Sequence, residues 1–189
     1  MALTVSESNT YVPAPQGTHV ARCTRLIDLG HQQTPFSDKP KPQIWLQFEL
    51  VDESVDDTRN YTVSRFYTLT LNKKSALRTD LEGWRGGALT PDELKGFDVL
   101  SMINIPCQVV VGHREKEGIV RTEIRSISAL PKGLQAAAAK SATLIFDMDT
   151  RDASVLAELP DWLVEIIQRA EEWQKPDSSD AGGDDDVPW

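Results

Sequence analysis

The sequence predicts a mainly β protein with helical insertions, followed by a C-terminal helix and an acidic tail. Three observations support this prediction. Five segments have the composition or the alternation of β-strands, with turn residues between them. A helical pattern separates the third of these segments from the fourth. At 189 residues and 40% hydrophobic composition, the chain can bury one ordinary core.

The first two predicted strands are separated by a proline-rich loop. Residues 1–16 have little periodicity, so we expect an N-terminal arm before the first strand, residues 18–30. The second strand, residues 44–50, alternates apolar and polar side chains and places Trp45 on the polar face. Residues 31–43 contain three prolines, which exclude a central strand or a helix interior. We therefore predict a long, partly basic loop there.

The third predicted strand, residues 61–71, precedes the helical insertion. It is dense in aromatic, β-branched and threonine residues, which favour strands. After it, Leu77, Leu81 and Trp84 recur at helical spacing. Residues 90–93 have the pattern of a capping box with proline at the first helical position. Both patterns predict helix between the third and fourth strands.

The last two predicted strands form a hairpin, and one further helix follows. Residues 105–113 and 118–130 are the strands, joined around "HREKEG". We expect a sheet domain over residues 17–132 and a connector with a C-terminal helix over residues 133–175. That helix carries an apolar stripe that could pack within the chain or form a dimer contact; the stripe comprises Trp162, Leu163, Ile166, Ile167, Ala170 and Trp173. Residues 176–189 lack periodicity and are expected to be a disordered acidic tail.

The net charge of −9 is distributed unevenly along the chain. Residues 1–140 carry 17 Lys and Arg against 16 Asp and Glu, whereas residues 141–189 carry 3 against 13. Nucleic-acid binding requires basic surface, but a near-neutral body can hold a local basic groove, and an acidic end is typical of an interaction tail. The acidic total therefore does not exclude a nucleic-acid partner.

The sequence contains no motif that indicates an enzyme. The three histidines are isolated, and we find neither a metal-ligand spacing nor a nucleotide-binding glycine loop. Cys23 and Cys107 lie in apolar segments and are expected to be reduced core thiols. No cofactor or metal is expected. No segment has the apolar length of a membrane span or the pattern of a signal peptide.

Aromatic and basic residues alternate along the strands and loops, which is the combination that holds single-stranded nucleic acid. Bases stack on aromatic faces while basic side chains follow the phosphates. The candidate DNA-binding residues are Lys39, Lys41, Trp45, Arg65, Phe66, Tyr67, Lys73, Lys74, Arg78, Trp84, Arg85, Arg114 and Lys116. The alternative is that Trp45, Phe66 and Trp84 fill the core and that the loop cations are ordinary solvated charges.

Five antiparallel strands with a helix between the third and fourth are typical of an OB-fold, a small barrel that binds oligonucleotides. In that fold the face of strands two and three and the flanking loops contact the ligand. Residues 35–43 would then form the first binding loop and residues 113–118 the second.

The chain also resembles a known class of proteins. Its last six residues, Asp184, Asp185, Asp186, Val187, Pro188 and Trp189, resemble the acidic C-terminal peptide of bacterial single-stranded DNA-binding proteins, which ends in three Asp, then Ile, Pro and Phe. The body is similar to phage-encoded single-stranded DNA-binding proteins in "RLIDLG", "WLQFEL", "KKSALRTDLEGWRG", "LKGFDVLSMI" and "LPDWLVEII". The resemblance implies that the tip binds replication, recombination or repair proteins. It also implies action in the cytoplasm of a bacterial host.

We therefore expect a non-enzymatic protein that binds and protects single-stranded DNA without sequence preference. One alternative is a protein-interaction adaptor or inhibitor whose acidic tail imitates DNA and whose body binds no nucleic acid. Another is a nuclease or phosphatase whose carboxylates come together from distant positions.

Overall fold

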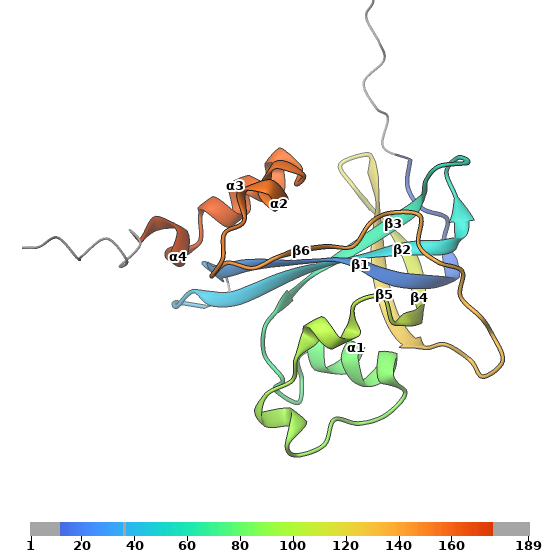
Figure 1. The fold of residues 1–189 in the computed structure, drawn as a ribbon, viewed down its shortest axis with the longest axis horizontal. Helices are drawn as coiled ribbons and strands as arrows, with labels where there is room; N and C mark the ends of the chain where they lie inside the picture. The colour runs from blue at the N-terminus through green and yellow to red at the C-terminus, as the bar shows by residue number, and fades with distance from the viewer. Residues whose placement is uncertain (1–11, 36, 176–189) are drawn as a thin grey trace, which may run out of the picture.

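Five long strands form the body of the structure, a computed structural model that describes residues 12–35 and 37–175. They pair antiparallel in the order β3-β2-β1-β4-β5, and a short sixth strand runs parallel to β1 (Figure 1). The strands are β1 (Gly17–Gln32), β2 (Lys41–Ser54), β3 (Asn60–Thr68), β4 (Pro106–Lys116), β5 (Ile119–Ala129) and β6 (Leu144–Phe146). The result is an open, mainly antiparallel sheet, which confirms the predicted mainly β class and its five principal strands.

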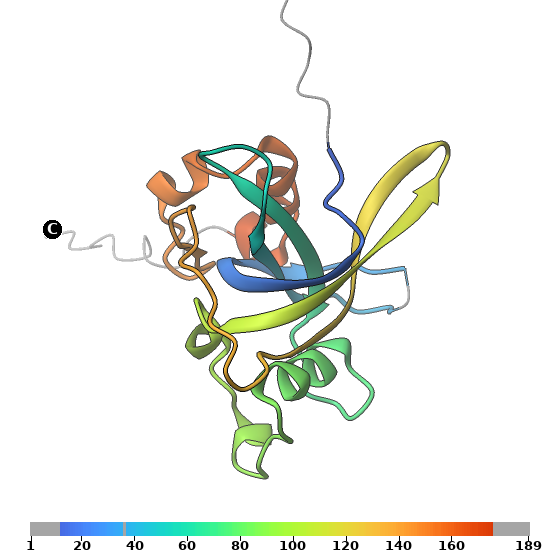
Figure 2. The same ribbon diagram turned by 90° about the vertical axis from the view of Figure 1, so that its right-hand side faces the viewer.

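The β1–β2 hairpin is longer, and its loop shorter, than the proline content predicts. β1 continues to Gln32 and β2 begins at Lys41, although Pro42 has no N–H for a ladder. Its carbonyl still accepts a hydrogen bond from the backbone N–H of Leu69, at 2.8 Å. The β4–β5 hairpin turns at Glu117 and Gly118, both with positive φ, as a tight two-residue hairpin turn requires. Figure 2 shows this hairpin projecting beyond the rest of the sheet.

The helical insertion between β3 and β4 is confirmed, and it consists of short pieces. It contains α1 (Ala76–Arg85) and two 3-10 turns, η1 (Glu93–Lys95) and η2 (Val99–Met102). The predicted capping box is present: the Thr90 N–H donates to the Glu93 carboxylate at 2.8 Å, and the Glu93 N–H donates to the Thr90 hydroxyl at 3.3 Å. It caps a single turn, however, and not a full helix.

One face of the sheet packs against α1; we call it the inner face. Apolar side chains from the first five strands and from α1 form a continuous core on it. The rings of Phe48 and Trp84 lie 5.2 Å apart, centroid to centroid. α1 approaches β5 so closely that a Cβ on Gly83 would come within 2.3 Å of the Ile127 carbonyl oxygen. Cys23 and Cys107 are buried free thiols in this core, as predicted.

The opposite, outer face is partly covered by the C-terminal segment. This segment contains α2 (Ala153–Ala157), α3 (Asp161–Gln168) and α4 (Glu171–Gln174), which lie above the sheet in Figure 1, with α1 below it. The segment forms a second core, which we call the outer core, comprising Ile27, Leu29, Trp45, Leu144, Phe146, Met148, Leu159, Leu163, Ile167 and Ala170. The apolar stripe of the predicted C-terminal helix therefore packs within the chain.

The predicted C-terminal helix, whose apolar stripe runs from Trp162 to Trp173, is instead broken at Ala170, where the backbone is extended. The break is explained by a tertiary contact. A Cβ placed on Gly30 would lie 2.9 Å from the Ala170 methyl carbon, so Ala170 sits directly on the bare backbone of Gly30. The following turn then carries the Glu172 carboxylate to the backbone N–H of His31, at 2.9 Å. Packing against β1 thus overrides the helical periodicity.

Candidate nucleic-acid interface

Two exposed aromatic rings, Phe66 of β3 and Trp162 of α3, lie at the outer face of β2 and β3. Phe66 lies directly opposite Trp45 in the register of the two strands. Trp162 from α3 stands edge-on to both rings, with centroids 5.9 Å from Trp45 and 6.3 Å from Phe66. Trp45 is buried beneath it, whereas Phe66 and Trp162 are each 46% exposed. The exposed pair Phe66 and Trp162 therefore lies where the start of α3 meets β3.

A groove of about 500 Å³ begins at Phe66 and runs between β3 and the β4–β5 hairpin. We call it the arginine groove. Its lining comprises Ser64, Arg65, Phe66, Arg114, Arg121, Thr122, Glu123, Ile124 and Arg125. Four arginines and one carboxylate thus line the groove, in a protein whose net charge is −9, and one of the four, Arg65, also pairs with Asp80 outside the lining.

The charges in the arginine groove are only partly neutralised. Glu123 accepts from Arg114 at 2.9 Å and lies 3.6 Å from Arg125. Arg121 forms no ion pair within residues 12–35 and 37–175, yet it stands directly opposite Arg114 across the hairpin. Like charges in such cross-strand pairs repel and destabilise a sheet. An anion between them would convert that repulsion into binding.

Arg65 lines the arginine groove and also links β3 to α1 and β5. Its Nη1 lies 2.9 Å from Asp80 of α1 and donates to the Ile124 carbonyl oxygen at 3.4 Å. Asp80 also accepts from the Tyr67 hydroxyl at 2.7 Å. Burial raises the pKa of Asp80, although the bonds from Tyr67 and Arg65 oppose that shift. Burial and the neighbouring carboxylate likewise raise the pKa of Tyr67.

Three of the predicted stacking residues are core residues in the structure. Trp45, Tyr67 and Trp84 are each 3% exposed, so their rings are not available to a base. The alternation of β2 predicts a polar face at Trp45, but the C-terminal helices cover that face. Trp84 points from α1 into the inner core and donates its Nε1–H to the Ile105 carbonyl at 3.3 Å.

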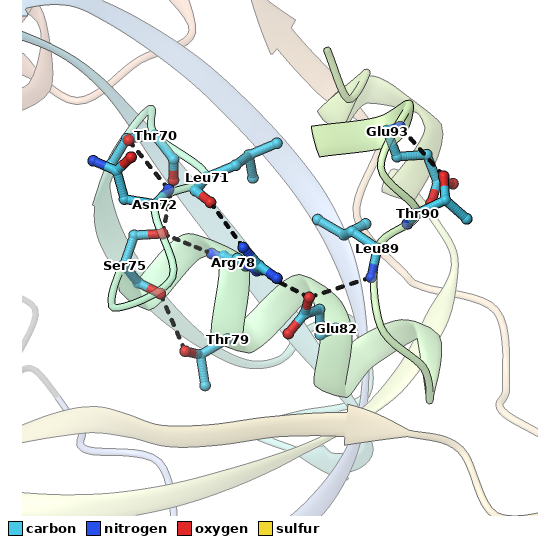
Figure 3. Close-up of polar contacts among 10 residues, drawn as sticks. All are labelled: Thr70, Leu71, Asn72, Ser75, Arg78, Thr79, Glu82, Leu89, Thr90 and Glu93. Carbon is cyan, nitrogen blue, oxygen red and sulfur yellow. Dashed lines mark hydrogen bonds and ion pairs between the residues drawn. The ribbon is translucent and has the colours of Figure 1, made fainter. Parts of the chain in front are cut away.

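The predicted cations around α1 lie on the other side of the sheet from the arginine groove. Arg78 pairs with Glu82 within α1 at 3.0 Å, and it donates to the Leu71 carbonyl, which ties the preceding loop to the helix (Figure 3). Arg85 pairs with Glu93 at 2.7 Å. Lys73 and Lys74 are exposed just before α1. These residues, predicted to bind DNA, are separated from Phe66 by the sheet.

The remaining predicted cations occupy the two hairpin ends. Lys39 and Lys41 are exposed at the β1–β2 end, and Lys116 is exposed at the β4–β5 turn. Because β1 and β4 are antiparallel, these two loops extend from opposite ends of the sheet (Figure 1). Of the predicted set, the arginine groove brings together Arg65, Phe66 and Arg114.

Sequence reasoning missed Arg121, Arg125 and Trp162. The signal for the first two was present, because Arg121, Glu123 and Arg125 alternate along β5 and therefore share a face. Trp162 belongs to the predicted apolar stripe of the C-terminal helix, and the stripe gave no indication that its first residue stays half exposed.

Among the described residues, no group of three or more His, Cys, Asp or Glu side chains is placed to hold a metal ion. No helix in the same part of the chain is long and apolar enough to cross a membrane. The predicted acidic tip, residues 184–189, lies outside the described residues. Comparison of the sequence with known proteins found no matching family model and no matching curated protein.

Proposed function

We propose that the protein binds single-stranded DNA without sequence preference and is not an enzyme. The observation that carries the proposal is the exposed Phe66–Trp162 pair at the mouth of the arginine groove. Base stacking on such rings contributes about 1–3 kcal/mol per base, and guanidinium groups neutralise the phosphates. Stacking does not depend on the identity of the base, so this site favours sequence-independent binding.

We further propose that the open sheet is an OB-fold-like barrel. The two ends of the strand path, β3 and β5, are joined through Arg65, whose guanidinium bonds to the Ile124 carbonyl. The aromatic pair lies on the face of strands two and three, where OB-folds bind oligonucleotides. The position of the site and the order of the strands both support this assignment.

Intrinsic tryptophan fluorescence tests the position of the bound strand. Oligo(dT) should quench the emission of the wild-type protein, because a base stacked beside Phe66 also contacts the exposed ring of Trp162. Trp45 and Trp84 are buried and should contribute an unchanged signal. Both proteins lack residues 177–189 in this comparison, because Trp189 would report displacement of the tail. In Trp162→Phe the quenching should largely disappear while binding, measured by anisotropy of labelled oligo(dT), persists. Equal quenching in both proteins would exclude the proposed site.

The acidic C-terminal residues are proposed to recruit partner proteins and to compete with DNA for the basic surface. Aspartates steer the encounter with a basic partner, and a buried aromatic anchor supplies affinity. Deleting residues 177–189 should abolish capture of replication, recombination or repair proteins and should tighten binding of oligo(dT) at low salt. If pull-down and anisotropy titration show no change in either property, the tail has no part in the mechanism.

The second candidate function is a DNA-mimicking adaptor or inhibitor whose body binds no nucleic acid. The concentration of acid after residue 140, 13 Asp and Glu against 3 Lys and Arg, favours it. The same anisotropy titration distinguishes the two, since an adaptor of this kind would bind neither single-stranded nor duplex DNA at any salt concentration.

A further inference from the structure

A second polar pocket lies on the outer face of the sheet, next to the arginine groove. It encloses about 450 Å³ between β1, β2, β3 and the connector that leads to β6. Its polar lining includes Arg25, Gln47, Arg59, Thr62 and Lys140. We call it the Arg25 pocket.

A β-bulge places Arg25 in this pocket. Cys23 pairs with Phe48, and Arg25 pairs with Gln47, so Thr24 is the extra residue of β1. Without the bulge the alternation of β1 would place Arg25 on the inner face, in the apolar core. Bulges commonly redirect a side chain in this way next to functional sites.

Arg25 lacks a counter-ion among the residues that the structure describes. Its Nε atom is buried and without a hydrogen-bond partner, and the guanidinium forms no ion pair with any residue of the described ranges. The side chain as a whole is half-buried. A donor such as Nε that is removed from water without a partner is unfavourable, and such groups are therefore usually paired. The unpartnered Arg25 side chain is explained if an anionic ligand supplies the missing partner.

Glu49, the carboxylate in the lining of the pocket, is occupied by other donors. Its Oε1 accepts from the Lys140 N–H at 2.6 Å and from the Asn60 amide at 2.8 Å. Its Oε2 accepts from the N–H of Ser141 at 3.0 Å and from the Ser141 hydroxyl. Burial alone would raise the pKa of Glu49, but these hydrogen bonds lower it, so the carboxylate stays ionised. Glu49 thereby fixes the connector as one wall of the pocket.

The other two cations differ in how far they are compensated. Arg59 is neutralised by Asp56, with Nη2 and Oδ2 2.6 Å apart. Lys140 donates to neutral oxygens, the Ser54 hydroxyl at 3.1 Å and the Asp56 carbonyl at 3.2 Å. With Arg59 paired, Arg25 and Lys140 give the pocket two positive charges against the single negative charge of Glu49, so its lining keeps an excess of positive charge.

The Arg25 pocket and the arginine groove are neighbours on one strand. Thr62 lines the pocket and Ser64 lines the groove. Both side chains point outward from β3, and residues two apart on a strand are separated by about 7 Å. We propose that the Arg25 pocket binds a phosphate group of the DNA strand held in the arginine groove. The strand then follows β3 from Phe66 toward Thr62. This inference rests on the proposed function.

The test compares Arg25→Gln with a matched control, Lys95→Gln, in which an exposed cation of η1 on the α1 side of the sheet is removed. Binding of oligo(dT) of about twelve residues, within the usual range for one such fold, is measured by anisotropy. Arg25→Gln should weaken binding about tenfold, as expected for loss of a charged hydrogen bond, and should lower the slope of log K against log salt by about 0.7. Lys95→Gln should change neither. Arg25→Lys, which keeps the charge, should keep the slope; circular dichroism verifies that each variant is folded.

The outcomes separate this inference from the proposed function. If the wild type binds oligo(dT) and Arg25→Gln binds equally well, the pocket has no role and the arginine groove stands alone. If the wild type does not bind oligo(dT), the proposed function fails, and thermal unfolding with added inorganic phosphate becomes the decisive measurement. A rise in Tm that requires Arg25 would identify a site for free phosphate and overturn the strand path. No rise would overturn phosphate binding altogether.

Discussion

Replacing Phe66 by alanine should weaken the binding of single-stranded oligonucleotide by about 5- to 150-fold, the effect of losing one base stack of about 1–3 kcal/mol. The ring is 46% exposed and lies on the outer face, so its removal leaves the inner core intact. Its contact with Trp162 is edge-on, at 6.3 Å between centroids. The free energy of unfolding should therefore change far less than the free energy of binding.

The matched control for this variant is Leu69→Ala. Leu69 is 43% exposed and follows the end of β3, outside the arginine groove. Its truncation removes a similar exposed apolar surface and should leave binding unchanged. Equal losses of affinity in the two variants, or no loss in Phe66→Ala, would show that Phe66 is not a stacking residue. Anisotropy titration at fixed salt measures both.

Replacing Trp45 by alanine should lower the free energy of unfolding by about 3–5 kcal/mol, the usual result of emptying a large buried site. Trp45 is 3% exposed and belongs to the outer core that joins the C-terminal helices to the sheet. It also supports Trp162, at 5.9 Å. Loss of the indole should therefore loosen α3 and reduce oligo(dT) binding as a secondary effect.

Trp45→Phe is the control that separates packing from hydrogen bonding. The indole Nε1 of Trp45 is buried without a hydrogen-bond partner, so phenylalanine removes an unsatisfied donor as well as volume. We expect a loss well below that of the alanine variant. Denaturant unfolding measures both free energies. A loss under about 1 kcal/mol in Trp45→Ala would mean that the C-terminal segment is not held by this core.

Strand periodicity predicts the sheet because it depends on neighbouring residues alone. The alternation Ile44, Leu46, Phe48 identifies the inner face of β2, and all three side chains belong to the inner core. The environment of Trp45, one residue along, depends on helices more than a hundred residues away in sequence. Because Gln47 and Glu49 on the same face are polar, the local sequence predicts that Trp45 is exposed to solvent. In the structure Trp45 belongs to the outer core.

The same limit explains β6 and the broken C-terminal helix. Three residues, Leu144–Phe146, are too few to show a period, and they form a strand because β1 offers them a partner. The chain reaches β1 through a connector whose carbonyls at Ala136 and Ala137 accept bonds from Arg22. None of these contacts has a local sequence signal.

The candidate site is divided in the same way. Arg65 and Phe66 are adjacent in sequence and could be predicted as a pair. Their association with Arg121 and Arg125 requires the register of the β4–β5 hairpin and its approach to β3. Arg25 requires the bulge at Thr24, which no alternation reveals. By contrast, Arg78 is a basic residue of the kind that contacts DNA, but it forms an ion pair with Glu82, one helical turn away.

The central claim is that the outer face binds single strands through stacking and phosphate neutralisation, and an equilibrium titration of labelled oligo(dT) tests it most directly. Anisotropy is followed at several salt concentrations, with a duplex of equal length in parallel. We predict saturable binding of the single strand, an affinity that falls steeply and linearly in log K against log salt, and much weaker binding of the duplex. Absence of saturable single-strand binding at low salt, or equal affinity for the duplex, would contradict the claim.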